Sequence, residues 1–163
     1  SEVLVQNTVK SAVTFKGMGL HSGKPVHLVV RPASAGYGIW FRRTDLRGVD
    51  TLVPARWDAV VPSKLCTLIA NDDGVQVSTI EHLMAALAGL AVNNALIEID
   101  GPEVPIMDGS AGPFVFLLQS AGIELQNIRD PSDLRRRASK LRPSELDTPS
   151  SANATHLARA SKR

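Results

Sequence analysis

Apolar and polar residues alternate along much of the first half of the chain, which is the pattern of strands with one buried face. The alternation predicts strands over three segments: residues 9–15, 26–30 and 38–43. Two further strands are expected at 65–69 and 75–77, joined as a hairpin by the turn sequence Asn-Asp-Asp-Gly at 71–74. Residues 45–62 are predicted to form a loop with short extended pieces.

Helical spacing of apolar residues begins after this hairpin. The first predicted helix has its core face at four positions: Ile80, Leu83, Met84 and Leu87. Ser78 stands three residues before Glu81, the spacing of an S-x-x-E capping box, so we expect the helix to begin there. A strand over 95–99 precedes a second helix, which begins near Pro113 and ends at Gly122. This order predicts an α+β fold, with a two-layer sheet packed on two helices.

Charge divides the chain into two unlike parts. Residues 1–126 hold 9 Lys/Arg and 12 Asp/Glu, a net charge of −3, and all seven aromatic residues. Residues 127–163 hold 9 Lys/Arg and 4 Asp/Glu, a net charge of +5, and lack Val, Phe, Tyr and Trp. Because such a segment cannot bury enough apolar area to offset chain entropy, we expect a folded unit over 1–126 and a basic, mostly disordered tail over 127–163.

Composition also limits the cellular compartment in which the protein is expected. A single Cys excludes an internal disulfide framework. No apolar stretch approaches the roughly 20 residues of a spanning helix, and the N-terminus shows no targeting pattern. We therefore expect a soluble, cytoplasmic protein with no transmembrane segment. The basic tail has no aromatic residues, so it does not indicate nucleic-acid binding, and a solvated terminus is its simplest interpretation.

The first helix carries residues that its core face does not explain. On a helical wheel His82 falls opposite that face, beside the small residues Ala85, Ala86 and Gly89, so we expect another layer to cover this side. Glu81 is either a capping residue or a general base. His82 is either a surface histidine or a zinc ligand. Neutral imidazole binds zinc well, and a nearby carboxylate can activate a metal-bound water.

Three other segments contain candidate residues. The glycine-rich segment 17–23 misses the Walker pattern, and it is either a simple strand connection or a tight turn that presents His21 at the edge of a site. Cys66 is expected in mid-strand, as a small buried or pocket-lining residue rather than a nucleophile. Residues 108–110, Asp-Gly-Ser, predict a turn and a cap for the second helix.

Five motifs in order give the sequence a family resemblance over roughly residues 4–126. They are G-M-G-L-H-S-G at 17–23, R-R-T-D at 42–45, L-C-T at 65–67, S-T-I-E-H-L at 78–83 and P-I-M-D-G-S-A at 105–111. Together they resemble the UDP-3-O-acyl-N-acetylglucosamine deacetylases, zinc amidohydrolases of lipid A biosynthesis. The resemblance implies one half of the family's two-domain sandwich, in which the sheets lie outside and the helices lie between them.

The resemblance also implies roles for individual residues. His82 matches a zinc ligand of the family. Glu81 matches the general base that activates the zinc-bound water for attack on the amide carbonyl, after which acetate leaves. His21 matches a histidine of the family's glycine loop, beside the substrate. Three further matches line the substrate site near the metal: Leu65, Cys66 and Thr67.

The sequence departs from the family after Gln126. The family's second domain supplies two more zinc ligands on a helix with an H-K-x-x-D pattern, and residues 127–163 do not resemble it. We interpret them as a truncation, a shifted reading frame or a lineage-specific extension. Since a catalytic zinc needs about three protein ligands and this chain offers one match, His82, zinc can be absent here. The chain alone is then expected not to deacetylate UDP-3-O-acyl-N-acetylglucosamine at the family's rate.

Three hypotheses follow from this departure. In the first, the chain is the first half of a deacetylase and acts only with a second-domain chain. In the second, it is a repurposed binding or structural subunit that docks its Glu81/His82 helix face on a larger assembly. In the third, it is an inert remnant. A homodimer could cover the same helix face, but it would not supply the missing ligands.

Overall fold

The computed structural model describes residues 4–56, 59–61, 63 and 66–128. The predictions for the tail from residue 129 onward fall outside the described residues. In chain order the elements are β1 (Leu4–Val9), β2 (Val13–Met18), β3 (Pro25–Pro32), β4 (Ile39–Arg43), β5 (Leu52–Pro54), β6 (Val60–Val61), β7 (Leu68–Ala70), β8 (Gln76–Ser78), α1 (Glu81–Gly89), β9 (Ala95–Ile99), α2 (Gly112–Ala121) and β10 (Ile123–Ile128).

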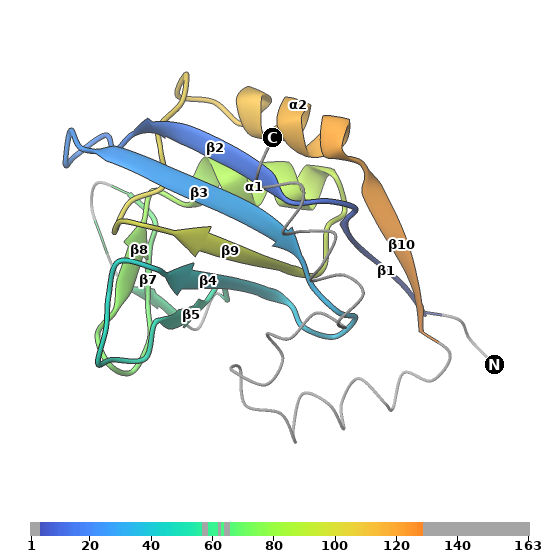
Figure 1. Ribbon diagram of the computed structural model, residues 1–163, viewed down its shortest axis with the longest axis horizontal. Coiled ribbons are helices and arrows are strands. Elements are labelled where there is room, and N and C mark those ends of the chain that lie inside the picture. The colour runs from blue at the N-terminus through green and yellow to red at the C-terminus, as the bar shows by residue number, and fades with distance from the viewer. Residues whose placement is uncertain (1–3, 57–58, 62, 64–65, 129–163) are drawn as a thin grey trace.

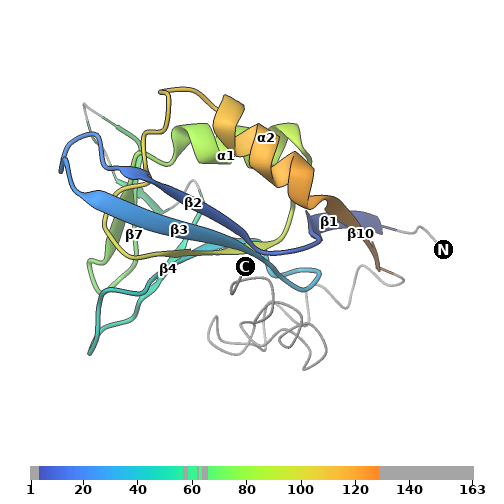
Figure 2. The same cartoon turned by 45° about the horizontal axis from the view of Figure 1, so that its top comes forward.

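A five-stranded mixed sheet forms the centre of the fold, with strand order β2-β3-β9-β4-β5. The middle strand, β9, pairs antiparallel with β3 and parallel with β4. Its residues Ala95, Leu96 and Ile97 are all buried, because β9 is covered on both faces, and this explains their unbroken apolar run. Helices α1 and α2 lie together over one face of the sheet (Figures 1 and 2). The predicted α+β fold is confirmed.

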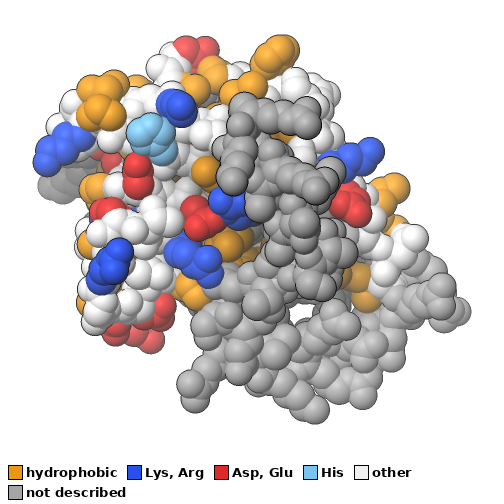
Figure 3. Space-filling view, viewed as in Figure 1, with side chains coloured by type: hydrophobic (Ala, Val, Ile, Leu, Met, Phe, Trp, Pro, Cys, Tyr) orange, Lys and Arg blue, Asp and Glu red, His pale blue; other side chains and the backbone are white. Residues whose placement is uncertain are grey.

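The main core lies between the helices and the sheet. Phe15 of β2 and Phe114 of α2 are both fully buried there, with ring centroids 5.0 Å apart. A second, smaller apolar cluster, separate from the main core, is formed by Tyr37, Leu52 and Leu96. Burial raises the pKa of Tyr37 to about 12. Charged side chains of both signs are spread over the face shown in Figure 3, as expected where polar side chains alternate with buried ones.

Strands β1 and β10 form a separate antiparallel ribbon at one end of the molecule (Figure 1). The predicted single strand over 9–15 is therefore wrong: the chain leaves β1 at Val9 and begins β2 at Val13, although both valines are buried. The alternation of apolar and polar residues indicates which side chains are buried, but it does not indicate where the chain changes its pairing partner. Strand β10 was not predicted, because half of its residues are exposed and its burial does not alternate regularly, and it extends two residues past the predicted boundary at 126.

A small three-stranded sheet, β6-β7-β8, contains the predicted hairpin around 71–74, which is confirmed. Arg43 ties this hairpin to the central sheet. Its buried guanidinium donates to the backbone carbonyl of Gln76 at 2.8 Å and makes two hydrogen bonds, of 2.8 and 2.7 Å, to Asp45. These bonds from Arg43 hold the pKa of the Asp45 carboxyl below its usual value. The R-R-T-D motif therefore has a structural role, because its Arg43 holds the hairpin that precedes α1 in the chain.

Neither helix in the described part of the chain has the length and the apolar character that crossing a bilayer requires. Helix α2 has Pro113 in its first turn and ends at Gly122 with φ of +90°, as its sequence predicts.

Two phenylalanines of α2 test the placement of the core. Phe114→Ala removes a fully buried ring, so we expect the free energy of unfolding to fall by about 3–5 kcal/mol in urea titrations. Phe116 is 70% exposed, and Phe116→Ala is the matched control, expected to stay within about 0.5 kcal/mol of the parent. Equal losses in the two variants would contradict the assignment of the buried helix face.

Candidate active site

The turn between β8 and α1 sets the start of the helix that carries the main candidate residues. Thr79 is buried and has φ of +59°, a left-handed conformation that costs a residue other than glycine about 1–3 kcal/mol. Two backbone hydrogen bonds hold the turn. The N–H of Ser78 donates to the carbonyl of Pro102 at 2.8 Å, and the N–H of Thr79 donates to the carbonyl of Thr67 at 2.9 Å. Two neighbouring segments therefore offset the strain of this turn.

The predicted capping box is wrong. Ile80 is the N-cap residue, and no side chain caps α1. Ser78 belongs to β8, and its hydroxyl donates to a backbone carbonyl of the neighbouring segment at 3.2 Å. The half-buried Glu81 carboxylate instead accepts a hydrogen bond from the N–H of Thr67 at 3.4 Å. The left-handed residue 79 explains the error, because it turns the chain between the two members of the expected box.

His82 follows Glu81 in the first turn of α1 and is half-buried. His82 makes no hydrogen bond to any residue that the structure describes, so neither of its ring nitrogens is bonded to a described protein atom. Ala85 and Gly89 are exposed, as the helical wheel predicts. Ala86 was placed on the same side, and this is wrong: it is fully buried in the core, because the packed face of α1 is wider than the four positions of the predicted stripe.

Asp108 lies close enough to His82 for their charges to interact. The pKa of its exposed carboxyl is lowered chiefly by hydrogen bonds from the Ser110 hydroxyl and N–H, and to a lesser degree by the charge of His82. The predicted turn at 108–110 is confirmed by these bonds, of 2.7 and 2.9 Å. The predicted cap is confirmed at Ser110: Ala111 is the N-cap residue of α2 and makes no side-chain capping bond, but the Ser110 hydroxyl accepts a hydrogen bond from the N–H of Gly112, the first residue of the helix, at 3.2 Å.

The described residues do not complete a zinc site. Across the described ranges no three His, Cys, Asp or Glu side chains come together as a group that could hold a metal ion. A catalytic zinc takes about three protein ligands. His82 can supply one imidazole, and the remaining ligands would have to come from residues that the structure does not describe or from another chain.

The described part of the L-C-T motif is linked to Glu81 through the N–H of Thr67. Leu65 is outside the described residues. Cys66 is half-buried in a bend before β7, with its sulfur 3.9 Å from the hydroxyl of Ser63, so its predicted mid-strand position is wrong. The pairing of β7 begins only at Leu68. Thr67 contacts the site through its backbone. Its N–H donates to the Glu81 carboxylate, and its carbonyl accepts a hydrogen bond from the N–H of Thr79 in the strained turn.

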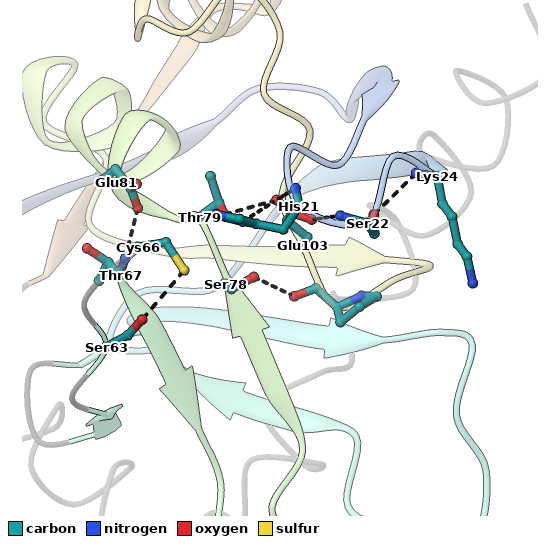
Figure 4. A network of polar contacts seen from close by, with 11 residues as sticks. His21, Ser22, Lys24, Ser63, Cys66, Thr67, Ser78, Thr79, Glu81 and Glu103 are labelled. Carbon is teal, nitrogen blue, oxygen red and sulfur yellow. Dashed lines mark hydrogen bonds and ion pairs between the residues drawn. The ribbon is translucent and has the colours of Figure 1, made fainter.

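His21 is joined to the same turn by Glu103, a residue that the sequence analysis did not single out. The buried Glu103 carboxylate accepts hydrogen bonds from the N–H of His21 at 2.8 Å, from its Nδ1 at 3.0 Å, and from the N–H of Ser22 at 3.1 Å. It also accepts one from the hydroxyl of Thr79 at 3.3 Å. Figure 4 shows Glu103 in the space between His21 and Thr79.

A glycine makes this approach possible. A Cβ atom on Gly19 would lie 2.4 Å from the hydroxyl of Ser22 and 2.7 Å from Oε2 of Glu103, closer than real contacts allow. The glycine-rich segment 17–23 therefore wraps around a carboxylate of its own chain. This accounts for the glycine at position 19.

The site thus combines a carboxylate with an adjacent imidazole at the start of a fixed helix. Glu81 can accept a proton, and His82 can bind a cation or exchange a proton. Cys66 and Thr67 adjoin Glu81, and His21 is connected through Glu103. The sequence held only a weak signal for Glu103, a single acidic residue between Pro102 and an apolar run, because its partners lie about 80 residues away.

The ionisation of Glu103 gives the fold a dependence on pH. Burial raises the pKa of this carboxyl, but the hydrogen bonds from His21 and Ser22 outweigh burial and lower it below its ordinary value of about 4.3. The unfolded chain then binds more protons in this range, so the stability that ionised Glu103 contributes is full above about pH 5 and is lost as the pH falls through the folded-state pKa.

We therefore expect the stability difference between the parent and Glu103→Gln to shrink as the pH is lowered from 6 to 3. Urea titrations at several pH values measure it. Other acidic groups are common to both proteins and cancel in the difference. A difference that stays constant from pH 6 to pH 3 would show that the ionised form of Glu103 is not preferentially stabilised by folding.

Comparison with known proteins places these features in a family. The family model of the UDP-3-O-acyl N-acetylglycosamine deacetylases matches residues 6–146. The UDP-3-O-acyl-N-acetylglucosamine deacetylase of Shewanella woodyi is 56% identical over 125 residues, which cover 77% of this chain and 41% of that protein. The enzymes of that name from Photobacterium profundum and Aliivibrio fischeri are 55% and 57% identical over 123 residues, covering 75% of this chain and 40% of each relative.

The chain therefore spans about two fifths of the length of these curated relatives. The matched region includes every candidate residue described above, from His21 to Glu103. Because the family model covers most of the chain, this protein belongs to the UDP-3-O-acyl N-acetylglycosamine deacetylase family.

Proposed function

We propose that this chain carries the first part of the active site of a UDP-3-O-acyl-N-acetylglucosamine deacetylase of lipid A biosynthesis, acting in the cytoplasm. One observation carries the proposal. Glu81 and His82 are consecutive residues at the start of α1, and the hydrogen-bonded turn at Thr79 fixes where that helix begins. Relatives of that name are 55–57% identical to this chain over the 123–125 aligned residues, which supports the same assignment.

In the proposed reaction Glu81 is the general base. Its carboxylate takes a proton from a water molecule while the water oxygen attacks the carbonyl carbon of the substrate's N-acetyl group. The C–N bond then breaks, acetate leaves, and the nitrogen takes up a proton to become the free amine. The N–H of Thr67, 3.4 Å from the Glu81 carboxylate, helps to keep that group oriented.

The other candidate residues have supporting roles in this proposal. His82 would be one ligand of the zinc ion that the family resemblance implies, and in a complete site that metal would polarise the carbonyl. The substrate side of the site is formed by four residues: His21, Leu65, Cys66 and Thr67.

We further propose that the 163-residue chain does not reach the family's rate by itself. Among the described residues His82 has no partners that would complete a zinc site. The faces of α1 and α2 that point away from the sheet also expose small and apolar side chains, among them Ala85, Gly89 and Phe116. A covering layer, either the complementary part of a deacetylase or a second copy of this chain, would bury them, and only the complementary part would add different ligands.

Acetate release from UDP-3-O-acyl-N-acetylglucosamine tests the proposal. We expect the chain alone to stay near background, and a mixture with the unmatched part of the Shewanella woodyi enzyme, about three fifths of it, to release acetate. In that mixture Glu81→Gln should lower the rate by about 10²–10⁴-fold. His27→Ala is the control: His27 is exposed and pairs with Asp100, and the rate should not change.

Two results would contradict this account. Robust zinc-dependent acetate release by the chain alone would show that it completes its own site. A mixture whose two parts bind each other but release no acetate would show that Glu81 and His82 do not work as proposed. Zinc analysis and mass measurement distinguish the remaining alternative, since a zinc-free chain found in a larger stable assembly would favour a binding or structural subunit.

A further inference from the structure

The described part of the chain contains two histidine–carboxylate pairs with the same pattern of hydrogen bonds and different burial. In each pair one carboxylate accepts both the backbone N–H and the Nδ1 of the same histidine: 2.8 and 3.0 Å for His21 with Glu103, and 2.7 and 2.9 Å for His27 with Asp100. The Glu103 side chain is 5% exposed, whereas that of Asp100 is 41% exposed. Water therefore competes for one carboxylate and is excluded from the other.

We propose that Glu103 is a positioning residue of the candidate active site, which holds His21 as the tautomer protonated on Nδ1 and ties its loop to the turn that starts α1. The consequence is that Nε2 of a neutral His21 remains an unprotonated acceptor that points away from Glu103. Its importance for catalysis rests on the proposed function, whereas the tautomer itself can be measured without any activity.

Three hydrogen bonds to the Glu103 carboxylate support this tautomer: one from Nδ1 of His21 and one each from the N–H groups of His21 and Ser22. An ionised carboxylate can only accept hydrogen bonds, so a neutral imidazole that bonds to it through Nδ1 must carry its proton on that nitrogen. The carboxylate is anchored independently of the ring, by the N–H groups of His21 and Ser22. The lowered pKa of Glu103 is consistent with the ionised form at neutral pH. The His21 side chain is 42% exposed, which leaves its other edge open to a ligand.

The same carboxylate reaches the start of α1. Glu103 accepts a hydrogen bond from the hydroxyl of Thr79, the left-handed residue two positions before Glu81. Around it, Ser78 forms a parallel bridge with Glu103, and the N–H of Val104 donates to the carbonyl of Ser78 at 3.0 Å. Glu103 therefore fixes the position of the His21 loop relative to the turn that orients Glu81.

This arrangement has a chemical use in a hydrolase site. A histidine that donates from one nitrogen to a buried carboxylate keeps a fixed ring plane, and its other nitrogen is available to accept a hydrogen bond from a substrate. Such an acceptor cannot be supplied reliably by a freely rotating histidine. Glu103 itself touches no substrate in this account and acts only through His21 and Thr79.

Nitrogen-15 NMR of the imidazole rings tests the proposal in the full 163-residue chain at pH 9, where histidines are in general neutral. We expect His21 to be protonated on Nδ1 in the parent. In Glu103→Met, which keeps the side-chain length and removes both acceptors, the ratio of the two tautomers should change by about tenfold or more toward protonation on Nε2. Asp100→Asn is the matched control and should leave the His21 signals unchanged.

Glu103→Gln provides a conservative comparison, because its amide oxygen can still accept from Nδ1 and should preserve the parent tautomer. A parent His21 protonated on Nε2, or an unchanged tautomer in folded Glu103→Met, would overturn the proposal. If Glu103→Met does not fold, the parent spectrum decides the question alone. Failure of the acetate-release experiment would refute the proposed function without altering this spectrum, so the two failures are distinguishable.

Discussion

The buried carboxylate of Glu103 joins three segments that are far apart in sequence. It accepts two N–H groups of the glycine-rich loop, the imidazole of His21 and the hydroxyl of Thr79. A buried charge is costly unless hydrogen bonds satisfy it, and here four donors do so. Because three of these donors come from the glycine-rich loop and the fourth from the turn before α1, the loop, the turn and the segment after β9 must all be in place together.

This constraint explains how a small unit can hold the candidate residues in fixed positions. The central sheet and the two helices supply the apolar core, and Arg43 fixes the hairpin that leads into α1. The left-handed Thr79 then turns the chain so that Glu81 meets Thr67. Strain at this turn is tolerated because the N–H groups of Ser78 and Thr79 and the carbonyl of Ser78 are bonded to neighbouring segments. The site therefore depends on the fold around it more than on the helix that carries it.

Most elements of this fold could be predicted from the sequence, because burial leaves a periodic signal. The strand over 95–99, the 71–74 hairpin and the helix ending at Gly122 all carry such a signal. The signal fails where partners matter more than burial. Half of the residues of strand β10 are exposed, and its pairing with β1 joins the two ends of the described region. The S-x-x-E spacing at Ser78 was misleading, since φ of Thr79 cannot be inferred from spacing.

The candidate site, like the fold, could be predicted from the sequence only in part. Glu81 and His82 could be named as candidates because they are adjacent and belong to a motif with a recognisable pattern. Glu103 was not, because its function in the fold consists of bonds to backbone amides about 80 residues away. Local patterns can identify residues that carry chemistry, but they cannot identify the residue that holds those positions together.

Hydrogen exchange of the backbone amides of His21 and Ser22 tests this account most directly. Both residues lie in an exposed loop, where amides that bond only to water exchange rapidly. If the buried carboxylate anchors the loop, these two amides should exchange as slowly as that of Thr79, which is bonded to the carbonyl of Thr67. Exchange of the His21 and Ser22 amides at the rate of an unstructured peptide, with Thr79 still protected, would contradict it.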